Sequence, residues 1–133
     1  MAYLRPAGFI RRVFNPLAMR FHIAGSATLT VPGRRTGGAR SVPLIPVEMD
    51  GTRYLVSARG ETEWVRNLRA AEGGMLVTKK ASERFRATEI PAAERPEIIS
   101  AYRKRAGRSV SSYFTKLPDP ADHPVFKVEP LGS

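Results

Sequence analysis

Asp50-Gly51 lies between two short segments rich in extended-chain formers, and it constrains the fold more than any other feature of the sequence. Asp-Gly favours a two-residue β-hairpin turn because both positions tolerate positive φ. It predicts an extended segment over 41–49, which two internal prolines restrict to an edge or bulged strand, and a return strand over 53–57. The chain is therefore expected to form an antiparallel meander here.

From residue 27 onward, the rest of the sequence also predicts antiparallel strands, with helices that follow the first few strands. Further strands are predicted over 27–31, 75–78, 85–90 and 125–128, and helices over 61–72 and 92–105. Thr62 is expected to cap the first helix and Gly73-Gly74 to end it, whereas the serine-rich stretch after Gly107 is expected to be flexible. Since strands and helices do not alternate, we predict an α+β fold: a mainly antiparallel, closed or split barrel of about six strands with flanking helices.

The N-terminal segment, 1–24, has the pattern of a basic amphipathic helix. Apolar residues recur at helical spacing among arginines, and Pro16 divides the pattern into pieces over 6–14 and 16–22. One interpretation is a helix that packs its apolar face on the barrel. The other is peripheral contact with an anionic membrane surface, because basic amphipathic helices also bind acidic lipids.

The length of 133 residues predicts a single domain spanning 1–133. The absence of cysteine excludes disulfides and thiolate metal sites, and a cytoplasmic location is expected, with possible membrane association, because no signal peptide or membrane-spanning stretch is visible. His22 and His123 have no second ligand at suitable spacing, so no metal is expected. The formal charge of +10 predicts a polyanionic or phosphorylated partner without choosing among nucleic acid, acidic lipid and ligand.

The segment 33–40 is the most distinctive part of the sequence. It joins two predicted strands and combines Arg34, Arg35 and Arg40 with three glycines. Guanidinium groups bind phosphate as planar two-donor forks, and backbone amides in a glycine-rich turn can surround an anion. The turn is therefore a candidate phosphate-binding loop, with a solvated basic hairpin as the alternative.

This turn resembles the T-x-x-G-R-x-[ST]-G-x-x-R motif of the deazaflavin (F420)-dependent nitroreductase family, with Thr30 at its start and Arg40 at its end. Further resemblances follow in the family's order over 42–44, 54–60, 63–70 and 124–128. Together they cover roughly 27–128. The resemblance implies an FMN-binding split-barrel-like fold, with 27–128 as the cofactor-binding barrel, and hydride transfer from reduced coenzyme F420 to a small unsaturated, quinone-like or nitro-aromatic acceptor.

The resemblance also implies which residues hold the cofactor, with F420 favoured over FMN. The basic turn would meet its phosphate and glutamate carboxylates, and a second segment, 57–60, would lie along the ring and phosphate. On the helix that follows, Trp64 and Asn67 are three residues apart and share a face. The implied cofactor-binding residues are Arg34, Arg35, Thr36, Gly37, Arg40, Ser57, Arg59, Gly60, Trp64 and Asn67. Core packing is the alternative for Trp64.

Tyr113 and Tyr102 match the family's tyrosines loosely and are the candidates for substrate contact or protonation. Tyr113 is placed in a loop after the last helix, whereas core packing is the alternative for Tyr102. A second hypothesis is a non-catalytic split-barrel protein that binds a lipid, haem or another cofactor. Nucleic-acid binding is not expected, because no recognition motif accompanies the charge. The protein is expected to be a monomer or a homodimer.

Overall fold

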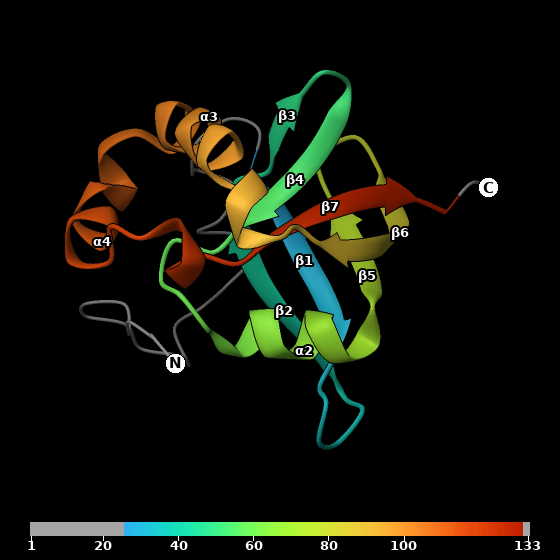
Figure 1. Cartoon of the computed structure of the whole chain (residues 1–133). Helices are drawn as coiled ribbons and strands as arrows, with labels where there is room; N and C mark the ends of the chain where they lie inside the picture. The colour runs from blue at the N-terminus through green and yellow to red at the C-terminus, as the bar shows by residue number, and fades with distance from the viewer. Residues whose placement is uncertain (1–25, 132–133) are drawn as a thin grey trace.

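Seven strands and three α-helices make up residues 26–131, which are the part of the chain that this computed structural model describes (Figure 1). The strands are β1 (Ala27–Pro32), β2 (Ala39–Leu44), β3 (Val47–Met49), β4 (Thr52–Val56), β5 (Gly73–Val77), β6 (Ser82–Glu89) and β7 (Val125–Pro130). The helices are α2 (Glu63–Ala71), α3 (Pro96–Ala106) and α4 (Ser111–Lys116), with 3-10 turns η2 (Ala92–Glu94), η3 (Gly107–Val110) and η4 (Pro120–Asp122). The helical pieces predicted near the N-terminus lie outside the described residues.

All seven strands pair antiparallel in one curled sheet, in the order β2-β1-β5-β6-β7-β4-β3. This confirms the predicted α+β split barrel, with seven strands rather than about six. The segment 41–49 is not one strand, because it breaks at Ile45-Pro46 into β2 and β3. These are the two edges of the sheet, as expected for strands beside prolines, which cannot donate to a neighbouring strand.

The predicted hairpin joins β3 to β4. Met49 pairs with Thr52, and the two intervening residues both have positive φ, 51° at Asp50 and 80° at Gly51. These values are those of a turn whose twist matches the flanking strands. The prediction from the Asp-Gly pair is confirmed.

Two hydrophobic clusters hold the helices against the sheet. In the first, α2 places Val65 and Leu68, both fully buried, against β1, β5, β6 and β7. In the second, α3, η3 and α4 pack against β3, β4 and the start of β7. Figure 1 shows the result: α2 closes one opening of the curled sheet, and α3 and α4 form a separate lobe beside it. Helices α2 and α3 each bury the apolar stripe that their periodicity predicts.

Two local predictions are wrong. Gly73 and Gly74 do not end α2; Glu72 does so in a left-handed conformation, and both glycines begin β5. A Cβ at Gly73 would lie 2.4 Å from the Phe85 carbonyl oxygen, so glycine is required there by the close approach of β6. The stretch after Gly107 is also not flexible coil, since it forms η3 and α4, and Tyr113 therefore lies in a helix.

Candidate functional site

The basic turn between β1 and β2 is a compact, hydrogen-bonded loop. The Gly33 amide donates to the Gly38 carbonyl over 2.7 Å, and the Gly37 amide donates to the Gly33 carbonyl over 2.8 Å. Gly37 has a φ of 78°, a conformation that side chains disfavour, and the Thr36 hydroxyl oxygen accepts from the Gly38 amide. The glycines of the motif therefore shape the loop that presents the arginines.

Arg34 docks this turn onto helix α2. Its backbone amide and its guanidinium Nη1 both donate to Asn67 Oδ1, over 3.1 and 2.8 Å, and Nη1 also reaches Glu63 Oε1 at 2.9 Å. Asn67 is buried, with 5% of its surface exposed, as predicted for an inward-facing polar residue that needs a partner. That partner is Arg34. Cofactor contacts of Arg34 and Asn67 stay predictions.

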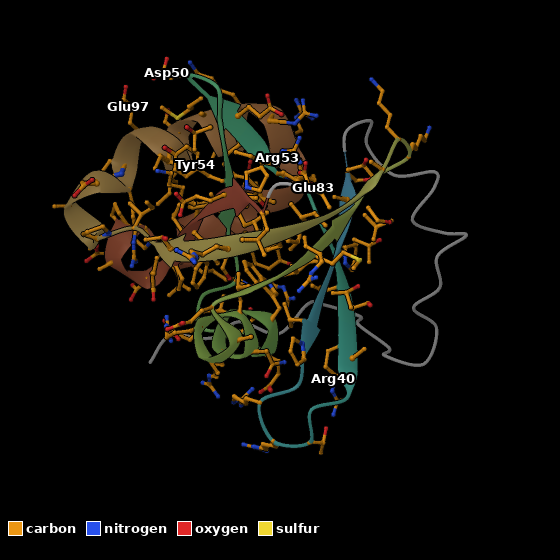
Figure 2. All side chains as sticks on the ribbon, turned by 90° about the vertical axis from the view of Figure 1, so that its right-hand side faces the viewer. Arg40, Asp50, Arg53, Tyr54, Glu83 and Glu97 are labelled. Carbon is orange, nitrogen blue, oxygen red and sulfur yellow. The ribbon has the colours of Figure 1, made fainter. Side chains whose placement is uncertain are left out.

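Arg35 and Arg40 are the exposed arginines of the turn. The hydrogen bond from Arg34 lowers the pKa of Glu63, and the positive charge of Arg35 contributes to this shift. Neither Arg35 nor Arg40 forms an ion pair within residues 26–131. Figure 2 shows Arg40 beside the turn at one end of the sheet, far from the Asp50 hairpin at the other end. Arg34 thus anchors the turn to helix α2, whereas Arg35 and Arg40 are exposed to solvent.

The second predicted segment, 57–60, follows β4 and leads into α2. Ser57 is 1% exposed, and its hydroxyl donates to the Gly60 carbonyl, which closes a tight turn. Gly60 has a φ of 90°, and its carbonyl also accepts from the Thr62 amide at 2.8 Å. The Ser57 amide donates to Pro124 at 2.9 Å, so the segment is tied to the start of β7. Its backbone is rigidly held.

Arg59 and Tyr113 both act electrostatically on the buried Tyr102. Tyr102 is buried against Phe114, and this burial raises its pKa to about 12, while the positive charge of Arg59 opposes the shift and Tyr113 adds to it. Tyr113 is only half-buried, on helix α4. The structure therefore groups Arg59, Tyr102 and Tyr113, with Tyr113 the more accessible hydroxyl.

Trp64 lies in the first hydrophobic cluster. It is 7% exposed, and its ring centroid lies 6.1 Å from that of Phe126 in a tilted arrangement. Such a contact is typical of a packed aromatic pair. The geometry accounts for Trp64 by core packing, and its contact with a cofactor stays a prediction.

Sequence reasoning missed a set of charged and polar residues beside the second segment. Arg69 on α2 forms two hydrogen bonds with the Glu61 carboxylate, of 2.9 and 3.1 Å, and two with Glu89 on β6, both of 2.8 Å. Arg95 and the fully buried His123 extend these contacts. No local spacing indicates them, because the partners meet only when the sheet forms.

The Arg69–Glu61 pair makes a prediction about acid stability. The hydrogen bond from Arg69 holds the pKa of Glu61 below its ordinary value of 4.5. Because the pKa of Glu61 is lower in the folded than in the unfolded state, its charge stabilises the fold at pH values above the unfolded-state pKa. This stabilisation is lost as the pH falls through the folded-state pKa. We expect Glu61→Gln to lower the melting temperature at neutral pH and to converge with wild type in acid. Equal differences at both pH values would contradict this.

Residues 26–131 show neither a metal-binding cluster nor a membrane-spanning helix. Among residues 26–131, no group of three histidine, cysteine, aspartate or glutamate side chains could hold a metal ion. None of the helices described there is long and apolar enough to cross a membrane. The proposed membrane-surface contact falls on the N-terminal segment, outside these residues.

Comparison with known proteins identifies the family. The family model for F420H(2)-dependent quinone reductases matches residues 6–117. A solved F420-H2 dependent reductase is 25% identical over 81% of this chain and 98% of its own, with a TM-score of 0.61. A structure described as a domain-swapped dimer is also 25% identical, over 81% of this chain and 82% of its own, with a TM-score of 0.63.

More distant matches support the fold alone. A protein of unknown function from Agrobacterium tumefaciens is 19% identical over 96% of this chain and 60% of its own, with a TM-score of 0.63. No curated protein sequence matches the chain. With the family model covering most of the chain and the split barrel in place, the protein belongs to the F420H2-dependent quinone reductase family and is an oxidoreductase that uses coenzyme F420.

Proposed function

We propose that the basic turn and the segment 57–60 together hold reduced F420 and that a quinone-like small molecule accepts its hydride. The observation that carries this proposal is the contact of Arg34 with Glu63, which puts the turn beside the first turn of α2. The turn that carries Arg35 and Arg40 therefore lies beside the start of α2, which closely follows the segment 57–60. A helix N-terminus beside exposed arginines favours a phosphate-bearing ligand.

The donor groups present fit that cofactor. Arg35 and Arg40 offer guanidinium donors suited to phosphate and carboxylate groups. Within residues 26–131, the buried side-chain atoms without a hydrogen-bond partner are Thr62 Oγ1 and Arg66 Nε, both at the N-terminal half of α2. Buried polar atoms are normally paired, so these two indicate a missing partner at this place.

The roles of the residues follow from this placement. F420H2 supplies a hydride from C5 of its deazaflavin ring. The turn arginines bind the charged tail, Gly60 allows close approach of the backbone, and Arg59 contributes positive charge near the ring. The Tyr113 hydroxyl donates a hydrogen bond or a proton to the acceptor as negative charge develops on it. Trp64 supports α2 from the core.

Oxidation of F420H2 by the purified protein tests the proposal. We expect turnover with menadione, a simple quinone, well above the rate without enzyme, and slower turnover with a nitroimidazole. An Arg35→Ala/Arg40→Ala protein should need a higher F420H2 concentration for half-maximal rate at both acceptors. Turnover with neither acceptor, by a folded protein that binds F420, would refute the proposed acceptor class.

We also propose a homodimer, because one similar structure is described as a dimer. Light scattering after size exclusion measures the mass directly. A mass of one chain across micromolar concentrations would contradict the proposal.

A further inference from the structure

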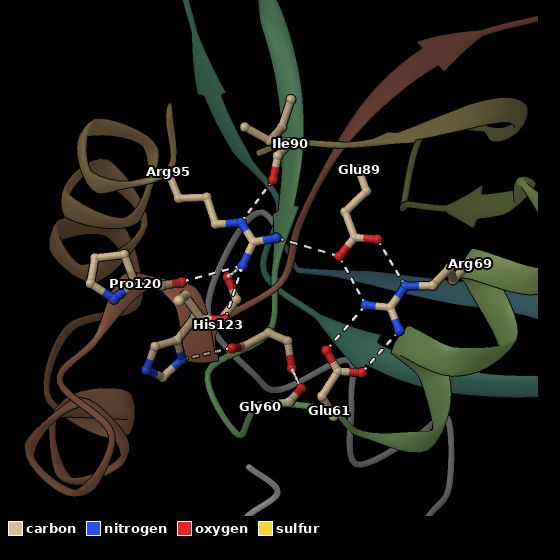
Figure 3. Close-up of polar contacts among 10 residues, drawn as sticks. Gly60, Glu61, Arg69, Glu89, Ile90, Arg95, Pro120 and His123 are labelled. Carbon is tan, nitrogen blue, oxygen red and sulfur yellow. Dashed lines mark hydrogen bonds and ion pairs between the residues drawn. The ribbon is translucent and has the colours of Figure 1, made fainter. Parts of the chain in front are cut away.

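A series of charged hydrogen bonds connects Glu61, next to the segment 57–60, with Arg69 on helix α2 and Glu89 on strand β6. Glu61 is bound by Arg69 through both carboxylate oxygens, and Arg69 also binds both oxygens of Glu89 (Figure 3). The guanidinium of Arg69 thus binds two carboxylates, those of Glu61 and Glu89. Arginine suits this position because its donors form a fixed planar fork that lysine lacks.

The series continues to Arg95, just before helix α3. Arg95 is 8% exposed, and its Nη2 reaches Glu89 Oε2 at 3.4 Å. Its other donors bind the carbonyls of Ile90, at 2.8 Å, and of Pro120, Ala121 and His123, at 3.3 to 3.4 Å. Figure 3 shows this guanidinium surrounded by carbonyl oxygens from the loop that precedes β7. Arg95 therefore fixes the path of that loop.

His123 closes the series into a ring. Its Nδ1 lies 2.9 Å from the Ser57 carbonyl, and its Nε2 contacts the carbonyl of Leu117, whose amide in turn donates to Tyr113. Both partners are backbone carbonyls, so the ring nitrogen that carries a proton donates to the carbonyl it faces. The imidazole of His123 stacks on the Phe114 ring, with 4.2 Å between the ring centroids, and His123 is fully buried. His123 thus spans the distance between the segment 57–60 and the end of α4.

We propose that this polar ring, defined as Ser57, Gly60, Glu61, Arg69, Glu89, Arg95 and His123, positions the segment 57–61 relative to helix α4. The segment carries Arg59, and α4 carries Tyr113. The inference rests on the proposed function, in which these two residues face the cofactor and the acceptor. Glu61, Arg69, Glu89, Arg95 and His123 are the positioning residues of the ring: they act through the backbone that they hold, without touching either ligand.

The positions of Arg59 and Tyr113 relative to each other affect the alignment of the hydride donor with the acceptor. Hydride transfer requires donor and acceptor atoms at close range, and a displacement of about 1 Å can lower the rate ~10²-fold. Helix α2 belongs to the first hydrophobic cluster and α4 to the second, so neither cluster by itself joins these two helices. Directional hydrogen bonds add to this alignment. They matter most at the buried Ser57, Arg95 and His123, where a broken bond leaves an unsatisfied polar atom. The bonds of Arg69 are exposed to solvent and act through the fixed geometry of its fork.

Arg69→Met tests the ring, with Arg53→Met as a matched control. Arg53 also contacts two carboxylates, Glu48 at 3.3 Å and Glu83 at 3.6 Å, and its side chain is similarly half-exposed, but it lies outside the ring (Figure 2). In the protein without cofactor, amide hydrogen exchange should become ~10-fold faster in both 57–61 and 117–124 for Arg69→Met. The control should leave both segments unchanged.

The same variants are then compared in a single turnover with saturating F420H2 and menadione. We expect hydride transfer to slow ~10- to 10²-fold in Arg69→Met, to recover partly in Arg69→Lys, and to stay within twofold of wild type in the control. His123→Gln should give the same pattern of exchange. It keeps a donor for one of the two carbonyls and therefore gives a smaller effect.

Two results would overturn the inference. One is unchanged exchange in either segment of a folded Arg69→Met protein, because the ring then does not couple them. The other is a wild-type transfer rate despite faster exchange, because the coupling then has no role in catalysis. A wild-type protein that binds no F420 would instead refute the proposed function, and the exchange experiment would still report on the coupling.

Discussion

The Tyr113→Phe protein is expected to transfer hydride ~10²- to 10⁴-fold more slowly than wild type while its affinity for F420 changes less than twofold. The substitution keeps the ring, which packs against the second hydrophobic cluster, and removes only the hydroxyl. If that hydroxyl stabilises charge on the acceptor, the loss is confined to the transition state. Stopped-flow oxidation of F420H2 by menadione and a separate binding titration measure the two quantities.

Tyr102→Phe is the matched comparison. Tyr102 is 6% exposed, and burial raises its pKa to about 12, so it keeps its proton across the working range. We expect a small effect on rate. If Tyr113→Phe reacts at the wild-type rate and Tyr102→Phe is slow, the catalytic assignment belongs to the buried tyrosine. If neither variant is slow, the proton comes from solvent.

Arg34→Ala is expected to weaken F420 binding by ~1.5 to 3 kcal/mol and also to lower the melting temperature. The side chain holds the turn on α2 through Asn67 and Glu63, so its loss releases the loop as well as a positive charge. Arg40→Ala should weaken binding by a similar amount with an unchanged melting temperature, because Arg40 is exposed and forms no ion pair with the other residues of 26–131. Calorimetric titration and thermal unfolding separate these outcomes.

The control for both is Arg108→Ala, which removes an exposed positive charge from η3, in the lobe formed by α3 and α4. A protein that merely attracts a polyanion would lose affinity equally in all three variants. Unchanged affinity in both Arg34→Ala and Arg40→Ala, with the fold intact, would remove the turn from the binding site.

Local signals in the sequence predicted most elements of this fold. The Asp50-Gly51 turn was recognisable because its chemistry depends only on neighbouring residues. The pairing of β4 with β7 and of β1 with β5 was not, since it joins segments that no local pattern relates. Helix α4 was missed because serine and glycine favour loops, whereas burial of Phe114 and Val110 stabilises helical structure there.

The candidate site was predictable to a similar extent. The basic turn stands out in composition alone, and Asn67 is buried as its position on the inner face of the helix predicts, although the expected partner was the cofactor. Its partner, Arg34, lies 33 residues away and could not be named from spacing. His123 was considered only as a metal ligand, yet its two ring nitrogens serve the backbone carbonyls of Ser57 and Leu117. The sequence indicates which polar and charged residues stand out, whereas only the structure shows which of them are hydrogen-bonded to each other.

The most direct test of the account is a titration of the purified protein with F420, FMN and haemin, followed by absorbance and fluorescence. We expect saturable F420 binding with one cofactor per chain, weaker binding of FMN, and a lower F420 affinity in the Arg35→Ala/Arg40→Ala protein. Preferential binding of haemin or FMN, or F420 binding that is indifferent to both arginines, would contradict it.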